Sequence, residues 1–133
     1  MFETVMFFVF LGLTVLGIVS TLFLGLKKRR RAHLISAVST TVLLAITVVF
    51  ALMLGKVRDF PPDEMAFHKI FSHASAYSLL AVAITGMRLW RAPSWRWAHR
   101  VCIAVFLLSA LTATCTGLWV FSLSTPVALP GLP

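Results

Sequence analysis

Four long apolar runs, separated by short polar segments, make up almost the whole chain. The runs extend over residues 2–26, 32–55, 65–90 and 98–123. A helix that crosses a bilayer needs about 20 mostly apolar residues, and each run meets that length. The pattern therefore predicts an all-α fold: an integral membrane four-helix bundle, with residues 1–133 as a single transmembrane domain.

The composition also indicates that the chain lies in a lipid bilayer. Of the 133 residues, 59% are hydrophobic and 12% are charged, whereas soluble domains average about a quarter charged residues. A soluble domain of this length leaves a large part of its surface in water and could not hide so much apolar surface. We therefore expect the lipid bilayer to surround the chain, and infer no soluble substrate.

The order of charges around the first run distinguishes a membrane span from a signal peptide. Glu3 is the one charge at its start, and the basic cluster 27–31 follows the run. A cleavable signal has its basic region first and a small-residue cleavage site last. The first run is thus predicted to be a true span.

Basic residues gather on one side of the predicted membrane. Nine of them lie between runs one and two or around the break between runs three and four, whereas Lys56, Arg58, Lys69 and all four acidic residues lie on the other side. The positive-inside rule makes the basic side cytoplasmic, so both termini are predicted to be outside. The same rule accounts for the net charge of +8, and no nucleic-acid partner is inferred.

Two histidines occupy matching places, because His33 opens the second run and His99 opens the fourth. In a sequential bundle these helices are diagonal and parallel, so the rings lie at one depth, as bis-histidine haem requires. We therefore predict a haem b site with His33 and His99 as iron ligands. Arg31, Arg96 and Arg100, at the same level, are the predicted partners of the propionates.

A cofactor-free alternative remains open. Histidines beside arginines at the headgroup boundary are ordinary interfacial residues. Small residues recur every four positions in two runs, which favours close helix packing; the stripes are Ala37, Thr41, Ala45 and Ser109, Ala113, Gly117. The chain also lacks a glycine-rich phosphate loop, a CxxC pair and a carboxylate inside any run, so we do not expect an enzyme on its own. The alternative is an accessory subunit that packs against a larger membrane complex.

His73 is a weaker metal candidate, about two turns into the third run. Tyr77 or neighbouring serines could satisfy it by hydrogen bonds, or it could bind copper with a methionine or Cys115. His68, at the entrance of the same run, is predicted to be solvated.

Short sequence elements from Lys27 onward resemble the small bacterial membrane proteins of the CtaM/YozB type, which are implicated in maturation of haem–copper oxidases. These elements are Arg31-Ala32-His33, His73 early in the third run, His99-Arg100, and Thr116-Gly117 followed by an aromatic residue. The chain departs from that family because residues 48–55 hold no histidine. The histidine placement is also similar in architecture to membrane cytochrome b subunits. The resemblance implies a role in respiratory electron transfer or oxidase maturation, with a respiratory complex as partner. It also implies a bacterial inner membrane, with both termini on the periplasmic side.

Overall fold

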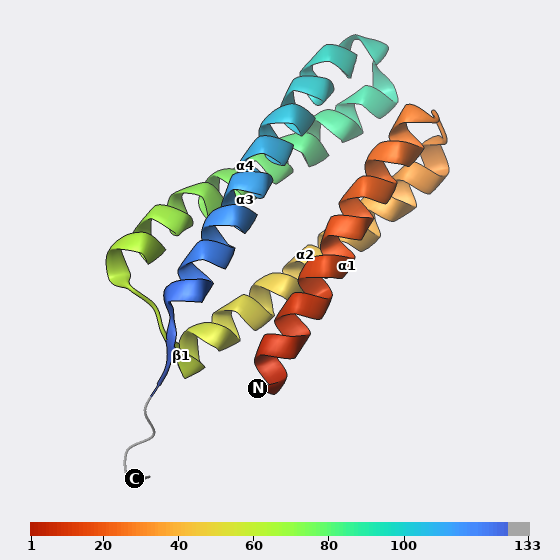
Figure 1. Cartoon of the computed structure of the whole chain (residues 1–133). Coiled ribbons are helices and arrows are strands. Elements are labelled where there is room, and N and C mark those ends of the chain that lie inside the picture. The colour runs from red at the N-terminus through yellow and green to blue at the C-terminus, as the bar shows by residue number, and fades with distance from the viewer. Residues whose placement is uncertain (128–133) are drawn as a thin grey trace, which may run out of the picture. The chain divides into compact units, whose positions relative to one another are not determined.

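The computed structural model describes residues 1–127 as four long helices with short connections (Figure 1). The helices are α1 (Phe2–Leu26), α2 (Arg30–Val57), α3 (Pro62–Arg91) and α4 (Arg96–Leu123). A 3₁₀ turn, η1 (Pro93–Trp95), precedes α4, and β1 (Arg58–Asp59) pairs with β2 (Thr125–Pro126). The all-α prediction is confirmed. Residues 128–133, which follow the predicted fourth run, lie outside the described residues.

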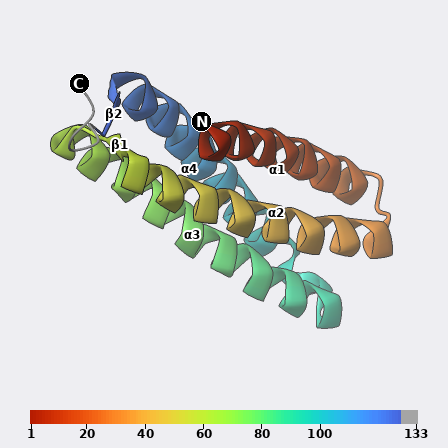
Figure 2. The ribbon, with the colours of Figure 1, turned by 90° about the horizontal axis from the view of Figure 1, so that it is seen from below.

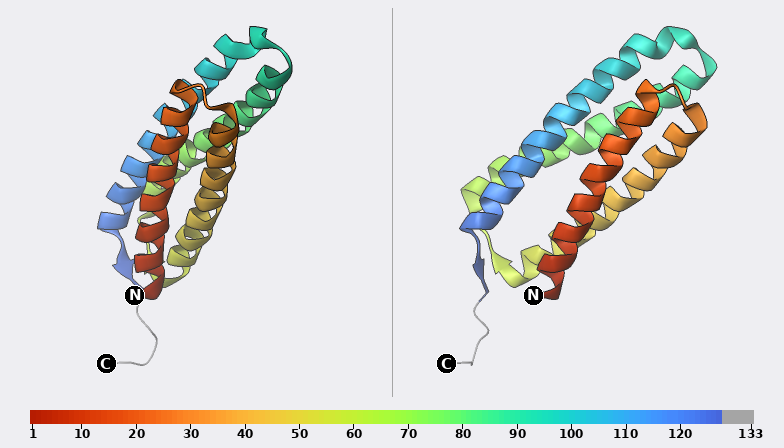
Figure 3. Two further views of the ribbon diagram at one scale, coloured as in Figure 1. Left: turned by 90° about the vertical axis from the view of Figure 1, so that its right-hand side faces the viewer. Right: turned by 45° about the vertical axis from the view of Figure 1, so that its right-hand side comes forward.

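The helices form two antiparallel hairpins. The N-terminal hairpin is α1 packed on α2, and the C-terminal hairpin is α3 packed on α4. Figures 2 and 3 show the two members of each pair side by side along most of their length. The first compact unit is built on Met1–Arg58 and the second on Asp59–Pro126. Each hairpin is described on its own below.

All four helices are long and apolar enough to cross a membrane, as expected of a multi-pass membrane protein. At about 1.5 Å of rise per residue, the 25 residues of α1 extend over roughly 37 Å, more than the ~30 Å of bilayer hydrocarbon. Large apolar side chains such as Leu16, Leu52 and Leu108 are more than 60% exposed to solvent in the chain alone. Lipid is the solvent that suits such surfaces.

Helix α3 begins three residues before the predicted third run. Pro62 occupies its first turn, where a missing N–H removes no helical hydrogen bond. Asp63 and Glu64 follow in the same turn, and Arg88 and Arg91 lie in the last turn. The helix dipole stabilises acidic residues in the first turn and basic residues in the last turn. These charged residues therefore belong to the helix although they are not apolar.

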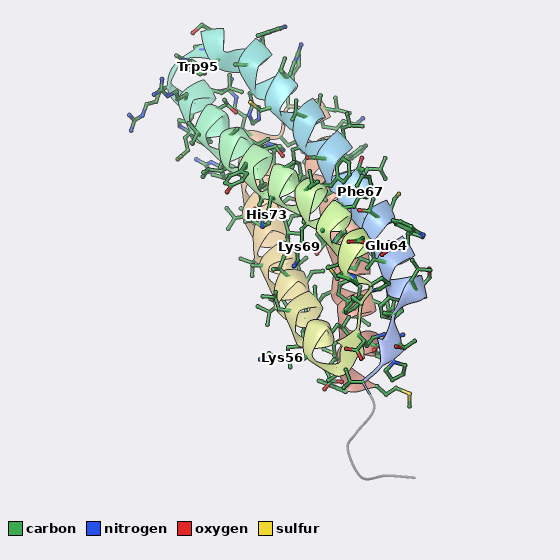
Figure 4. The ribbon with its side chains drawn as sticks, turned by 90° about the vertical axis from the view of Figure 1, so that its left-hand side faces the viewer. Lys56, Glu64, Phe67, Lys69, His73 and Trp95 are labelled. Carbon is green, nitrogen blue, oxygen red and sulfur yellow. The ribbon has the colours of Figure 1, made fainter. Side chains whose placement is uncertain are left out.

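The two hairpin turns are built differently. In the N-terminal hairpin, Lys28 adopts a left-handed backbone conformation with φ of 56° and reverses the chain between α1 and α2. In the C-terminal hairpin, η1 makes the turn, and the guanidinium carbon of Arg88 lies 4.7 Å from the centroid of the Trp95 ring. Trp95 lies at the end of the hairpin opposite Glu64 (Figure 4).

Hydroxyl groups join the helices inside each hairpin. The oxygen pairs are Thr14–Thr47 at 3.0 Å, Thr21–Ser36 at 2.7 Å and Ser78–Ser109 at 3.1 Å. Because lipid supplies no hydrophobic drive for helices to associate, small polar residues of this kind hold membrane helices together. The hairpin contacts are therefore polar and close-packed.

Candidate functional site

His33 lies half-buried between α1 and α2. Its Nδ1 is 2.8 Å from the backbone carbonyl oxygen of Thr21 on α1. A carbonyl oxygen only accepts hydrogen bonds, so Nδ1 carries the proton and donates it. Nε2 is then the unprotonated nitrogen of the neutral ring. Metal-bound histidines commonly show this arrangement, with the other ring N–H donated to a carbonyl.

Gly25 gives the His33 ring access to that carbonyl. A methyl group added at Gly25 would lie 3.1 Å from Nδ1 and 3.2 Å from Cε1 of His33. Gly25 follows Thr21 by one helical turn, so its side-chain position lies beside the oxygen that accepts the hydrogen bond. A glycine on one helix thus makes room for an imidazole from the other.

His99 has an equivalent place in the C-terminal hairpin. It is the fourth residue of α4, as His33 is of α2, and its Nδ1 lies 3.1 Å from Thr85 Oγ1. The Thr85 hydroxyl donates to the Ala81 carbonyl oxygen at 2.7 Å, so Thr85 Oγ1 accepts from His99 Nδ1–H. Gly86 provides the space, because a methyl group there would lie 3.2 Å from His99 Cε1.

His68 has the same surroundings, and the prediction that it is solvated is wrong. Its Nδ1 lies 3.1 Å from Thr116 Oγ1 and its Nε2 lies 3.0 Å from Ser72 Oγ. A methyl group at Gly117 would lie 3.0 Å from its Cε1. The error has a physical reason: α3 begins at Pro62, so His68 is nearly two turns inside the helix and faces α4.

These contacts come from a sequence pattern that occurs twice. The pattern is His-x9-Ser-x6-Thr-Gly, and its two copies are His68, Ser78, Thr85-Gly86 on α3 and His99, Ser109, Thr116-Gly117 on α4. Because α3 and α4 are antiparallel, the histidine of each copy meets the Thr-Gly pair of the other, and the two serines meet midway. The C-terminal hairpin is therefore two-fold in its contacts. The repeat could be found in the sequence, but the predicted stripes contain only Ser109 and Gly117 of its second copy.

One position distinguishes His68 from the other two half-buried histidines. Four residues after His68, Ser72 offers a hydroxyl that donates to the unprotonated Nε2. The same position after His33 is Ala37, and after His99 it is Ile103. Neither side chain can donate a hydrogen bond. Both ring nitrogens of His68 are therefore in hydrogen bonds, Nδ1 with Thr116 of α4 and Nε2 with Ser72 of its own helix. The residue four positions after His33 or His99 supplies no such bond.

The predicted propionate partners are exposed near these rings. Arg31 lies two residues before His33, and Arg96 and Arg100 flank His99; all three arginines are exposed. Among residues 1–127, no ion pair joins any of them to a carboxylate. Their cationic groups are therefore accessible to an anion at the turn end of each hairpin.

His73 lies on the exposed side of α3, one helical turn after Lys69 (Figure 4). Tyr77 is 73% exposed, and no side-chain hydrogen bond of His73 occurs among the described residues. The neighbouring Ser72 hydroxyl is directed to His68 instead. No cluster of three or more metal-binding His, Cys, Asp or Glu side chains is present within residues 1–127.

The two predicted small-residue stripes differ in what they contact. Ser109 and Gly117 lie at the α3–α4 contact, against Ser78 and His68. In the N-terminal hairpin, by contrast, Thr41 is exposed and its hydroxyl donates to the Ala37 carbonyl of its own helix. The contact with α1 instead uses a neighbouring set, His33, Ser36, Thr40 and Thr47.

His33 and His99 are thus half-buried imidazoles at the same position of α2 and α4, and each has its Nδ1 within hydrogen-bond distance of an oxygen of the neighbouring helix. Comparisons of the chain with protein-family models, with curated proteins and with solved structures found no match.

Proposed function

We propose that the protein binds haem b, with His33 and His99 as axial ligands, and acts in respiratory electron transfer or haem–copper oxidase maturation. The observation that carries this proposal is the state of the two rings. Each donates Nδ1–H to an oxygen of the neighbouring helix, and each is the fourth residue of its own helix. Bound haem would supply one-electron transfer.

The residues of the chain have separate tasks in this proposal. The Thr21 carbonyl and the Thr85 hydroxyl fix the proton on Nδ1 and hold each ring plane. Gly25 and Gly86 let the rings approach the partner helix. Arg31, Arg96 and Arg100 would hold the propionates by charge-assisted hydrogen bonds.

The proposal includes a topology. All four helices would cross a bacterial inner membrane, with the basic turns at residues 27–31 and 91–96 in the cytoplasm and the N-terminus outside. Support comes from the positive charge at the turn end of both hairpins. Cysteine-accessibility labelling at Arg30→Cys and Phe2→Cys, in a background with Cys102 and Cys115 replaced, tests it. Labelling of Arg30→Cys by an impermeant reagent in intact cells would contradict this orientation.

The test of haem binding is an absorption spectrum of the detergent-purified protein, produced with adequate haem, before and after reduction with dithionite. We expect a Soret band and sharp reduced α and β bands. His33→Ala and His99→Ala should each lose these bands. His68→Ala is the matched control, since this ring has the same threonine and glycine contacts, and its spectrum should be unchanged. A flat spectrum of the wild-type protein would refute haem binding.

A second pair of variants tests the role of position i+4. Ala37→Ser would place a hydroxyl donor where Ser72 stands beside His68, and it should lower haem occupancy by competing for Nε2 of His33. Ser72→Ala should leave the spectrum as it is. Equal haem content in the two variants would show that a hydroxyl four residues after the histidine does not affect haem binding.

A cofactor-free accessory subunit is the second candidate, and the observation that favours it is His68. This ring has both nitrogens in hydrogen bonds and packs against Gly117, so the fold uses a histidine for helix packing. If His33 and His99 serve only in this way, replacing both by alanine leaves the activity and assembly of the host membrane complex unchanged. Copper handling through His73 is tested in the same preparations, by metal analysis of the wild type and His73→Ala.

A further inference from the structure

The turn of the N-terminal hairpin concentrates positive charge that nothing in the hairpin neutralises. Residues 27–31 are five consecutive cations, Lys-Lys-Arg-Arg-Arg, and all are exposed. Within residues 1–127, no ion pair links any of the five to a carboxylate. Glu3, the one acidic residue between Met1 and Arg58, lies at the other end of α1.

The backbone adds to this charge. Helix α2 begins at Arg30, has no side-chain cap and has no acidic residue in its first turn. Its N-terminal end carries the positive pole of the helix dipole, which repels the cations placed there. In contrast, α3 has Asp63 and Glu64 in its first turn. The start of α2 is thus an arrangement that an external anion would stabilise.

The position of the turn indicates which anion is available to bind there. Both helices that it joins are long and apolar enough to cross a membrane. Lys27 adjoins this apolar surface, because its Nζ lies 5.5 Å from the centroid of the Phe23 ring, within the distance of a cation–π interaction. Clusters of four to eight cations next to a membrane helix bind anionic lipids.

From these observations we infer that residues 27–31 bind the phosphate of an anionic phospholipid headgroup. The occupant is a lipid rather than soluble phosphate, because the apolar side chains of Leu26 and Phe23 beside the cations are exposed and would lie against the acyl chains. This inference does not depend on haem: the lipid site would exist in a protein without a cofactor.

The test is native mass spectrometry of the detergent-purified full chain with equimolar phosphatidylglycerol and phosphatidylcholine. We expect phosphatidylglycerol to bind preferentially to the wild type. Lys28→Gln with Arg30→Gln should weaken its binding by roughly 20- to 30-fold, since each cation near the surface contributes about a fivefold effect. These two substitutions do not change Arg31, the predicted propionate partner.

The matched control removes the same charge elsewhere, with Lys56→Gln and Lys69→Gln, and should retain the lipid preference. Circular dichroism checks that both variants keep the helical content of the wild type. A second measurement uses the wild type alone: raising the ionic strength should weaken phosphatidylglycerol binding, and inorganic phosphate at matched concentration should not displace the lipid. Equal losses in both double variants, no preference between the two lipids, or displacement by inorganic phosphate would each overturn the inference.

Discussion

Two glycines of α1 offer a direct test of how closely the hairpin helices pack. A methyl group added at Gly17 would lie 2.6 Å from Thr40 Oγ1 and 3.2 Å from its Cγ2. A methyl group added at Gly12, five residues earlier in the same helix, would have no neighbour within 4 Å. The two substitutions to alanine make the same chemical change in the same helix, and only one of them creates a clash.

The magnitudes follow from two opposing effects. Alanine is preferred over glycine inside a helix by about 1 kcal/mol, so Gly12→Ala should raise the free energy of unfolding by up to that amount. At Gly17 the same gain is opposed by overpacking, which typically costs about 1–3 kcal/mol. Thr40 cannot simply turn away, because its Oγ1 donates to the Ser36 carbonyl at 2.7 Å and lies 3.3 Å from Thr21 Oγ1. We expect Gly17→Ala to be destabilising by up to about 2 kcal/mol.

The assay is reversible unfolding of the full chain in mixed micelles with increasing sodium dodecyl sulfate, followed by helicity. The difference between the two variants should be roughly 1–3 kcal/mol, the cost of overpacking at Gly17. Gly25→Ala should fall between them, because the His33 ring is 3.1 Å away and an imidazole can shift by a few tenths of an ångström. The close-packing argument fails if Gly17→Ala is as stable as Gly12→Ala.

Three further predictions concern the turns and the polar contacts. Lys28→Gly should raise the thermal midpoint, because a left-handed backbone strains lysine by about 1 kcal/mol and glycine adopts it freely; an unchanged or lower midpoint would contradict the strain. A double-mutant cycle of Ser78→Ala and Ser109→Ala should show a coupling of about 0.6 kcal/mol, the typical value for hydrogen bonds between membrane helices; additivity would mean that the contact contributes nothing. Trp95→Leu should destabilise by about 0.5–1 kcal/mol through loss of the Arg88 contact, and Arg88→Gln should have no further effect in that background.

The apolar pattern predicted the helices well because length and hydropathy suffice for that purpose. The first run and α1 have the same bounds, Phe2–Leu26. The other helices extend two or three residues beyond the predicted runs, where Arg30, Pro62 and Arg96 open them. Helix ends depend on caps, turn residues and dipole effects, and an apolar pattern does not record these.

The contact faces were harder to predict, for a reason specific to lipid-facing helices. A helix that is apolar all round gives no amphipathic signal for the side that meets its partner. Thr40 and Thr41 are adjacent threonines in the sequence. Thr40 lies against Gly17 of α1, whereas Thr41 is exposed. Spacing alone favoured the stripe that contains Thr41, and only the register of the hairpin selects Thr40.

The repeat in the C-terminal hairpin separates what packing requires from what a cofactor would require. Two copies of one pattern on antiparallel helices produce each contact twice, so Thr85-Gly86 and Thr116-Gly117 serve equally to hold a histidine. Packing therefore explains the Thr-Gly pairs and the protonated Nδ1 of both rings, and it sets no requirement on Nε2. Among the positions at which the two copies differ is the one four residues after the histidine, with Ser72 in one copy and Ile103 in the other. A hydroxyl that occupies Nε2, as that of Ser72 does at His68, suits a histidine whose role is helix packing. The presence of histidines in this hairpin therefore does not by itself indicate a cofactor, and the comparison of His68→Ala with His99→Ala separates a packing role from a ligand role.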